Sequence, residues 1–355
     1  MAEWWKDNWE ESRQHYLDWW DRKGLVIGMW EHIEKDGPPH APVAAPPPAR
    51  DLEQFWFDPV WRSAYLHHGM SRGSFKADIL PVASTHLGPG SLAAILGAEM
   101  DGRPDTIWYR HLSEDSDEII FDENNRWWQL HLDLLRMCKE HAQGRYFVGC
   151  PDLIEGMDTL ASLRGTQPVL MDIIDRPDEL KRQLQAVNDV WFKVFDQIYD
   201  IINIDGEMAF CYFSIWGPGK VAKLQSDISI MISPRDFRRF VAPYIREQCQ
   251  WLDHSLYHLD GVGAMRHVDA LLEIEELDAI QWTPGVDKPQ GGDPCWYDLY
   301  KRILAGGKSV MPSLVEVDEL QPLLDAIGPH GVNVMLMFRT EQDIETAVKI
   351  AEQYR

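Results

Sequence analysis

Short apolar runs alternate with longer amphipathic stretches along most of the chain, and this alternation limits the fold more than any other feature of the sequence. The runs have the length and the β-branched and aromatic content of buried strands, whereas the stretches between them have helical spacing. Strands that alternate with helices predict a parallel sheet joined by crossover helices. The eight predicted strands cover residues 25–30, 77–83, 145–150, 208–216, 255–259, 278–282, 308–312 and 332–338.

Eight is the number of parallel strands that closes a (β/α)8 TIM barrel, and the chain has no Gly-x-Gly-x-x-Gly turn that would favour a Rossmann domain. The 355 residues are therefore predicted to form one α/β barrel domain, with residues 105–109 in an extra hairpin or lid. Residues 76–355 would form the core, and residues 1–75 an extension packed on it. That extension combines a proline-rich loop, residues 36–51, with a helix whose aromatic stripe is Trp5, Trp9, Tyr16, Trp19 and Trp20.

The formal net charge of −23, from 57 acidic and 34 basic residues, argues against a nucleic-acid or anionic membrane partner. The five cysteines are scattered without a Cys-x-x-Cys pair, which is typical of a reduced intracellular chain. The first 20 residues lack the apolar core of a signal peptide, and no stretch has the length of a membrane span. We therefore expect a cytoplasmic protein that acts on a small molecule.

Function in a barrel of this kind lies at the carboxyl ends of the strands, which predicts a set of rim residues. The predicted substrate-binding residues are His86, Tyr212, Trp216, Gln281, Trp282 and Arg339, and Asp152 and Glu155 are further rim carboxylates. Asp227 is a lone carboxylate in an apolar stretch, where burial would raise its pKa unless it is paired. It is either a functional acid or the cap of the following turn.

His258 and Asp260 stand two residues apart in a predicted strand, so their side chains project to the same face just before a glycine-rich loop. Three interpretations are open. The pair could bind a divalent metal together with a third ligand such as Glu316, because imidazole and carboxylate groups suit zinc or a similar ion. It could instead serve acid/base catalysis or substrate binding, or it could be a structural hydrogen-bonded pair.

Several stretches together resemble the uroporphyrinogen decarboxylase superfamily, which includes corrinoid-linked methyltransferases. The resemblance runs over about residues 75–350, and it is strongest in "KADILPVASTHLGPGSLAAILGAEM", "FVGCPDLIEGMDTLASLRGTQPVLMDIIDRPDEL", "SDISIMISPRDFRRFVAPYIREQCQWL", "HLDG" and "DAIQWTPGVDKPQGGDPCWY". It is closer to a branch often labelled trimethylamine corrinoid protein 2. The resemblance implies a barrel, and it implies that Asp78 occupies the position of the decarboxylase's catalytic aspartate.

The chain departs from both known activities of that superfamily. It lacks the arginine-rich N-terminal segment, a tyrosine in "TLASLRG" and a histidine in "MLMFRTEQD", so porphyrinogen decarboxylation is not expected. Thiol-methylating members hold zinc with His-x-Cys and a later cysteine. Here His258 matches the histidine, Asp260 stands in the cysteine's place, and Phe338 or Arg339 stands near the second cysteine. A carboxylate ligand makes the metal a harder Lewis acid, which favours activation of an oxygen- or nitrogen-bound group.

The sequence therefore predicts a methyltransferase that moves a methyl group between a small O- or N-methylated compound and a corrinoid. His258 and Asp260 would bind metal, most naturally zinc, or protonate the leaving group, and Asp227 would assist. The corrinoid-binding Asp-x-His-x-x-Gly signature does not occur, so a partner protein would carry the corrinoid. The alternatives are a lyase or hydrolase of a sugar-like or aromatic compound, and a non-catalytic corrinoid or small-molecule binding module. The resemblance also implies a homodimer.

Overall fold

The computed structural model describes residues 3–112 and 118–355. Its strands are β1 (Leu25–Gly28), β2 (Val82–Ala83), β3 (Glu99–Gly102), β4 (Ile107–Arg110), β5 (Phe147–Cys150), β6 (Glu207–Phe210), β7 (Ile215–Pro218), β8 (Val221–Gln225), β9 (His254–Asp260), β10 (Ala279–Thr283), β11 (Ser309–Pro312) and β12 (Val332–Met335). Its α-helices are α1 (Trp9–Trp20), α2 (Leu52–Phe57), α3 (Pro59–Arg72), α4 (Ser91–Ile95), α5 (Arg126–Ala142), α6 (Gly156–Arg164), α7 (Thr166–Asp175), α8 (Pro177–Ile202), α9 (Pro234–Phe240), α10 (Ala242–Trp251), α11 (Val268–Leu272), α12 (Tyr297–Ala305), α13 (Leu320–Ile327) and α14 (Glu341–Ala351).

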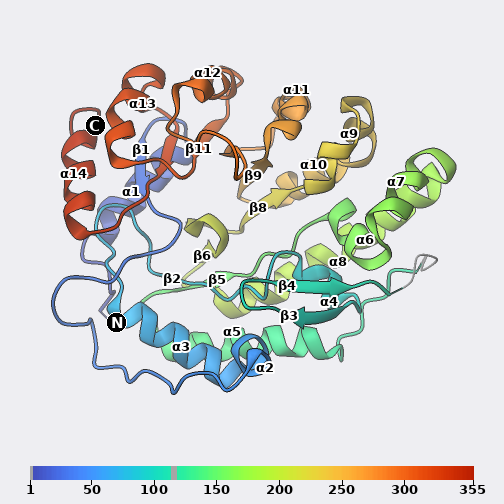
Figure 1. The fold of residues 1–355 in the computed structure, drawn as a ribbon, viewed down its shortest axis with the longest axis horizontal. Helices are drawn as coiled ribbons and strands as arrows, with labels where there is room; N and C mark the ends of the chain where they lie inside the picture. Colours follow the sequence, from blue (N-terminus) through green and yellow to red (C-terminus); the bar gives the residue numbers. More distant parts are fainter. Residues whose placement is uncertain (1–2, 113–117) are drawn as a thin grey trace.

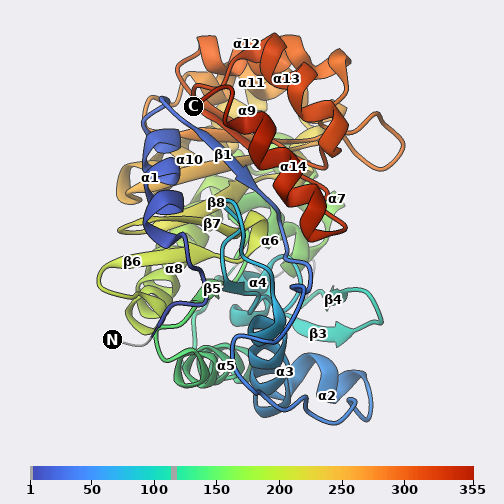
Figure 2. The ribbon, with the colours of Figure 1, turned by 90° about the vertical axis from the view of Figure 1, so that its left-hand side faces the viewer.

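The strands form a mostly parallel α/β core, with helices outside them (Figures 1 and 2). Six parallel strands follow the order β1-β12-β11-β10-β9-β8, and a second sheet has the order β2-β5-β6-β7. Among the described residues, no strand ladder joins the two sheets, so the predicted ring is not closed by strand pairing. A side chain bridges one seam, where the Ile27 amide of β1 donates to Asp78 Oδ2 at 2.9 Å. The architecture is thus barrel-like.

The segment around β6 and β7 differs from the prediction. Residues 208–216, which are predicted as one barrel strand, form most of an antiparallel hairpin of β6 and β7. The strand beside β9 is instead β8, whose sequence VAKLQ is entirely buried. The sequence did not predict β8 as a strand, because strand prediction expects apolar residues at buried positions and β8 contains a lysine and a glutamine. The extra hairpin predicted at 105–109 is present as β3 and β4.

The aromatic stripe of α1 packs on the strands. Trp9, Tyr16, Trp19 and Trp20 are all buried, as their spacing on one helical face predicts. Trp20 donates from Nε1 to the carbonyl of Trp216 at 2.9 Å, which ties α1 to β7. The division of the domain at residue 75 stays a prediction, and β1, which lies before it, pairs with β12.

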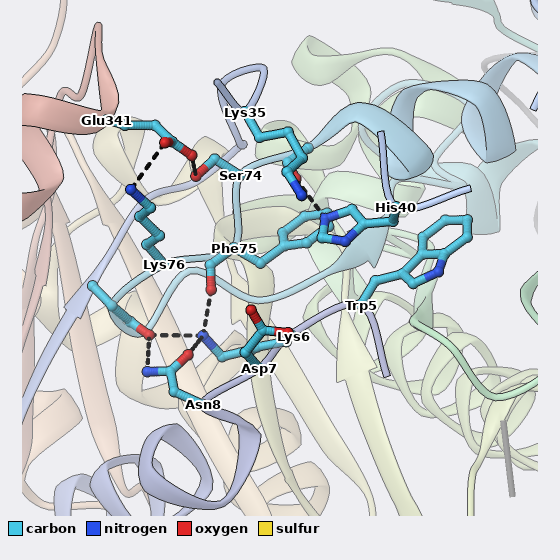
Figure 3. Close-up of a pocket in the computed structure, with 12 residues that line it drawn as sticks. Trp5, Lys6, Asp7, Asn8, Lys35, His40, Ser74, Phe75, Lys76 and Glu341 are labelled. Carbon is cyan, nitrogen blue, oxygen red and sulfur yellow. Dashed lines mark hydrogen bonds and ion pairs between the residues drawn. The ribbon is translucent and has the colours of Figure 1, made fainter. Parts of the chain in front are cut away.

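The N-terminal segment is anchored beside a pocket of about 270 Å³ (Figure 3). The buried ammonium of Lys6 donates to the carbonyls of Phe75 and Ala77 at 2.8 and 2.7 Å and to Asn8 Oδ1 at 2.9 Å. These three bonds use all three ammonium hydrogens, so the contact is structural. In the part of the chain that is described, no helix combines the length and apolar character that crossing a bilayer requires.

Candidate functional site

Three adjacent strands of the six-stranded sheet bring polar side chains to one place at their carboxyl ends. His258 on β9 is in register with Gln225 on β8 and with Gln281 on β10, and Asp260 is in register with Thr283. Because residues two apart on a strand share a face, Gln281 and Thr283 lie beside His258 and Asp260 as a second matching pair. The spacing that singled out His258 and Asp260 in the sequence therefore recurs on the neighbouring strand.

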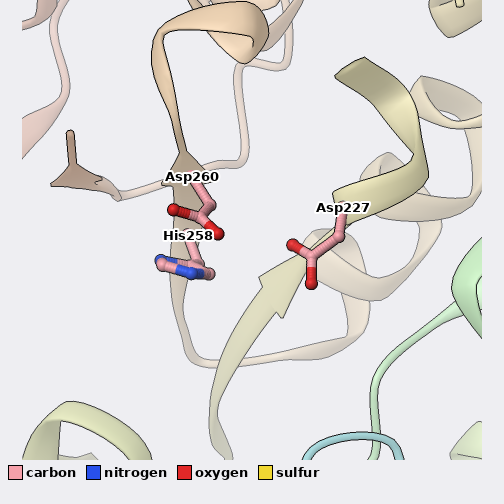
Figure 4. A group of neighbouring side chains, drawn as sticks. All are labelled: Asp227, His258 and Asp260. Atoms are coloured by element: carbon pink, nitrogen blue, oxygen red, sulfur yellow. The ribbon is translucent and has the colours of Figure 1, made fainter. Parts of the chain in front are cut away.

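Asp227, His258 and Asp260 form a cluster in which one potential ligand atom from each residue lies within 4.8 Å of the others (Figure 4). Asp227 follows β8 and opens a short 3-10 helix, whereas His258 and Asp260 come from β9. Over the whole residue Asp227 is exposed, although its carboxyl group is largely surrounded by protein, and the two β9 residues are half-buried. Asp227 and the β9 pair were predicted separately, and the structure brings them together.

The imidazole of His258 is held by one hydrogen bond and one ring contact. Its Nδ1 bonds with Gln281 Oε1, and its ring lies 5.2 Å from that of Phe213, centroid to centroid. Burial, aided by the nearby Lys223 ammonium, lowers the pKa of His258 to about 3, although the Gln281 bond opposes the shift. The side chain is therefore neutral near pH 7, which is the form of histidine that binds metals.

Asp227 has an environment that favours its protonated form. Removal of water by the surrounding protein, together with the carboxylate of Asp158, raises the pKa of Asp227 to about 7, against the effect of Lys223. Gln225 Nε2 donates to Asp227 Oδ2 at 3.0 Å. Burial also raises the pKa of Asp260. The cluster therefore combines a neutral imidazole with one carboxyl group, that of Asp227, that can carry a proton near neutral pH.

A buried ion pair and further carboxylates lie beneath the cluster. The Lys223 ammonium contacts the two carboxylate oxygens of Asp152 at 2.7 and 2.8 Å, and both side chains are at most 1% exposed. Asp158 accepts from the backbone amides of Asp227 and Ile228 at 2.7 and 2.9 Å. Burial raises the pKa of Asp158 to about 6.

Glu155 is the third carboxylate of this layer. It accepts from the backbone amide of Gln225 at 3.0 Å, and burial raises its pKa. The sequence predicted Asp152 and Glu155 as rim residues, but Lys223 and Gln225 escaped prediction because their strand did. Their i, i+2 spacing before Asp227 is the signal that could have found them.

The other predicted site residues have mixed positions. His86 and Tyr212 line a cavity of about 560 Å³, their rings 5.3 Å apart, and burial lowers the pKa of His86 to about 4. Gln281 is fully buried, and its side chain bonds to the imidazole of His258. Trp216 and Trp282 are core residues with no exposed surface: Trp216 packs on Trp9, and Trp282 packs on a neighbouring tryptophan, Trp296.

The remaining predicted site residues lie away from the cluster in the structure. Glu316, the predicted third ligand, makes a two-pronged ion pair with Arg339, with both contacts at 2.7 Å, and the third member of the cluster is Asp227. Asp78, predicted as catalytic, precedes β2, whereas His86 follows it, so Asp78 lies at the opposite end of that strand. Its buried carboxylate bonds to His15 at 2.8 Å and to Arg355 at 2.7 Å, which is a structural arrangement.

A largely apolar cavity of about 540 Å³ opens against the cluster through Asp227. Its lining combines two carboxylates with aromatic and aliphatic side chains, among them Ile107, Trp108, Tyr109, Ile154, Asp158, Asp227, Ile228, Ile230 and Met231. Ile154 has a left-handed backbone, with a φ of 56°, which is rare for a β-branched residue. Such strain is found mainly at functional sites, and here it shapes a wall of the cavity.

The cluster suits a divalent cation by the chemistry of its donors. Imidazole and carboxylate groups are ligands that zinc accepts, and three is the number of protein ligands in catalytic zinc sites, which keep a further position open. The contact between His258 Nδ1 and Gln281 is the outer bond that metal-bound histidines normally make, and it leaves Nε2 as the nitrogen available to an ion. The residues present therefore fit the ion that the sequence predicts.

These features define a barrel-like α/β protein with an aspartate–histidine cluster at the carboxyl ends of its parallel strands. No family model matches the sequence, and a search of curated proteins found no match. Among solved structures, the fold is similar to that of a methyltransferase from Methanosarcina mazei, with a TM-score of 0.62. The two are 11% identical, and the match covers 97% of this chain and 98% of that one. The likeness is therefore one of fold over the whole length of both proteins.

Proposed function

We propose that this protein is a methyltransferase that moves a methyl group between a small O- or N-methylated compound and a corrinoid carried by a partner protein. The observation that carries the proposal is the Asp227–His258–Asp260 cluster at the strand ends, beside a cavity of about 540 Å³. The fold it shares with a methyltransferase supports the same reaction class. The resemblance of the sequence to corrinoid-linked methyltransferases adds the corrinoid.

The reaction needs an activated leaving group. As the methyl carbon passes from its heteroatom to the cobalt of a reduced corrinoid, the heteroatom keeps the bonding electrons and must gain a proton or equivalent stabilisation. Asp227, with its pKa raised to about 7, can supply that proton near neutral pH. Alternatively, with Asp227 deprotonated, a divalent ion, most naturally zinc, held by Asp227, His258 and Asp260 would supply Lewis acidity in place of that proton.

The surface at the cavity mouth supports the partner-protein part of the proposal. Trp108, Ile230 and Met231 line this cavity and are 64%, 43% and 60% exposed. Large apolar side chains that gather at an opening are typical of contact surfaces. A corrinoid protein docked there would bring its cofactor to the cavity that Asp227 lines.

The test is methyl transfer to free reduced cobalamin, followed by the absorbance change that accompanies formation of methylcobalamin. A panel of methyl ethers and methylamines would be supplied as donors to the wild type and to His258→Ala. We expect turnover with at least one donor and at least a 100-fold loss in the variant, the scale set by the loss of an acid or an electrostatic stabiliser. No turnover with any donor, together with binding of a methyl ether or methylamine that His258→Ala leaves unchanged, would favour a binding module instead.

A further inference from the structure

We propose that Gln225 and Gln281 are positioning residues whose oppositely oriented amides make the cluster present only lone pairs to a ligand once Asp227 has lost its proton. The inference rests on the proposed function, because it assumes that the cluster is the reacting site. It deepens that function by assigning the protonation pattern of His258 and the class of group that the cluster accepts.

On the β10 side, a hydrogen-bond chain has its direction set by a main-chain carbonyl. The Trp282 carbonyl can only accept, and Ser313 Oγ donates to it at 2.8 Å. Since that bond uses the only hydrogen of Ser313, the Thr283 hydroxyl must donate across the 3.3 Å contact between them. Thr283 Oγ1 then accepts from Gln281 Nε2 at 2.8 Å. The carbonyl end of the Gln281 amide is left facing His258.

This orientation determines which imidazole nitrogen carries the proton. Gln281 Oε1 can only accept, so His258 Nδ1 is the donor of the bond between them. In a neutral imidazole the other nitrogen, Nε2, then has a free lone pair. If the Gln281 amide were reversed, the proton would move to Nε2 and block it as a ligand or base.

On the β8 side, the direction is set by a cation. The Lys223 ammonium, which can only donate, bonds to Gln225 Oε1 and to the carboxylate of Asp152. The amide nitrogen of Gln225 is therefore turned towards Asp227, to which it donates at 3.0 Å. This bond fixes Oδ2 of Asp227 as an acceptor and leaves Oδ1 free to face the cluster.

Both chains have the same result at the cluster. When Asp227 is deprotonated, carboxylate oxygens of Asp227 and Asp260 and Nε2 of His258 converge as acceptors, with one potential ligand atom of each residue within 4.8 Å of the others. Such a set repels anions, and it accepts a divalent cation or a protonated heteroatom. Buried networks with one consistent direction rigidify a site, so the two glutamines would also fix its geometry.

The protonation pattern of His258 can be read directly by NMR. The full chain, labelled with ¹⁵N-histidine and treated with a chelator, would be measured at pH 7.5, with the His258 signals assigned by their loss in His258→Gln. We expect a proton-bearing Nδ1 and a pyridine-type Nε2. Thr283→Val removes the relay hydroxyl and should give a mixture of tautomers, whereas Gln281→Glu keeps an acceptor at Nδ1 and should retain the wild-type pattern.

A matched control is Thr346→Val, because Thr346 is exposed on α14, bonds only within its helix and should change nothing. If Thr283→Val does not fold, Ser313→Ala removes the next hydroxyl of the chain and carries the same expectation. The inference is wrong if wild-type His258 carries its proton on Nε2, or if folded Thr283→Val or Ser313→Ala keeps a single wild-type tautomer. The expected tautomer in a protein that transfers no methyl group would support the inference and count against the proposed function alone.

Discussion

Lys223 is the residue on which the charge balance beneath the cluster depends. It is the one basic partner that Asp152 meets among the described residues, in a layer that also holds the carboxylates of Glu155 and Asp158. A buried charge loses far more when its partner is removed than a surface charge does, because no water replaces the lost contact. Lys223 is also the donor that orients Gln225, so it links stability with the geometry of the site.

We therefore predict that Lys223→Met lowers the free energy of unfolding by about 3–5 kcal/mol, the range for breaking a buried ion pair. Urea denaturation of the metal-free protein measures this change. The double variant Lys223→Met/Asp152→Asn should be less destabilised than the two single variants added together, because it leaves no unpaired Asp152 charge. A loss below about 1 kcal/mol in Lys223→Met would mean that the pair is not buried as described.

At the scale of elements, the site depends on close packing between β5 and the turn after β6. Gly149 on β5 has no room for a side chain: an added Cβ would lie 2.7 Å from Cys211 Cβ and 2.9 Å from Cys211 Cα. Cys211 immediately precedes Tyr212, which lines the cavity beside His86. Because Gly149 has no side chain, Cys211 can pack against β5, and this packing positions Tyr212 on the rim.

Gly149→Ala should lower the free energy of unfolding by about 1–3 kcal/mol, the usual effect of overpacking a core. Gly69→Ala is the matched control, because Gly69 lies within α3 and an added Cβ would meet nothing within 4 Å. That change should raise stability by roughly 0.5–1 kcal/mol, since alanine favours a helix over glycine. Thermal and urea unfolding would reveal opposite signs, and equal effects at the two positions would contradict the packing argument.

At the scale of the whole molecule, buried neutral histidines make the fold sensitive to acid. His131 is 1% exposed, with Nδ1 donating to the Trp127 carbonyl at 2.6 Å and Nε2 2.9 Å from the Ser91 hydroxyl. Burial lowers its pKa from 6.5 to about 4. His67 and His86 have pKa values lowered to about 4 for the same first reason. These histidines lie on α3, on α5 and at the rim of the cavity, so the stability of all three regions should depend on pH in the same direction.

The sign of this response follows from proton linkage. Between pH 6.5 and 4 the unfolded chain binds a proton at His131 and the folded protein does not, so stability is lost as the pH falls. His131 alone would account for up to roughly 3 kcal/mol across that interval. His131→Gln removes this titration, so the stability advantage of the wild type over the variant should shrink from pH 8 to pH 4. A constant difference across that range would contradict a buried neutral His131.

The sequence was sufficient for the elements whose burial pattern is simple. The strands at 255–259, 278–282 and 308–312 and the extra hairpin are apolar and short, and they appear in the structure as β9, β10, β11 and β3–β4. Sequence reasoning missed β8 because that strand buries a lysine and a glutamine. Lys223 bonds to Asp152, which is distant in the sequence, and Gln225 bonds to Asp227, which follows the strand. No local sequence pattern reveals these bonds. The ion pair of Glu316 with Arg339 depends likewise on how distant loops meet.

The central claim is that Asp227, His258 and Asp260 together bind one divalent cation, and metal content measures it most directly. Elemental analysis would be made of the purified wild type, His258→Ala, Asp260→Ala, Asp227→Ala and Glu316→Gln. We predict about one equivalent of zinc or another divalent metal in the wild type and in Glu316→Gln, and at least about ten-fold less bound metal in the other three. Metal that survives in Asp227→Ala but is lost in Glu316→Gln, or a wild type that binds none on dialysis against zinc, would contradict the claim.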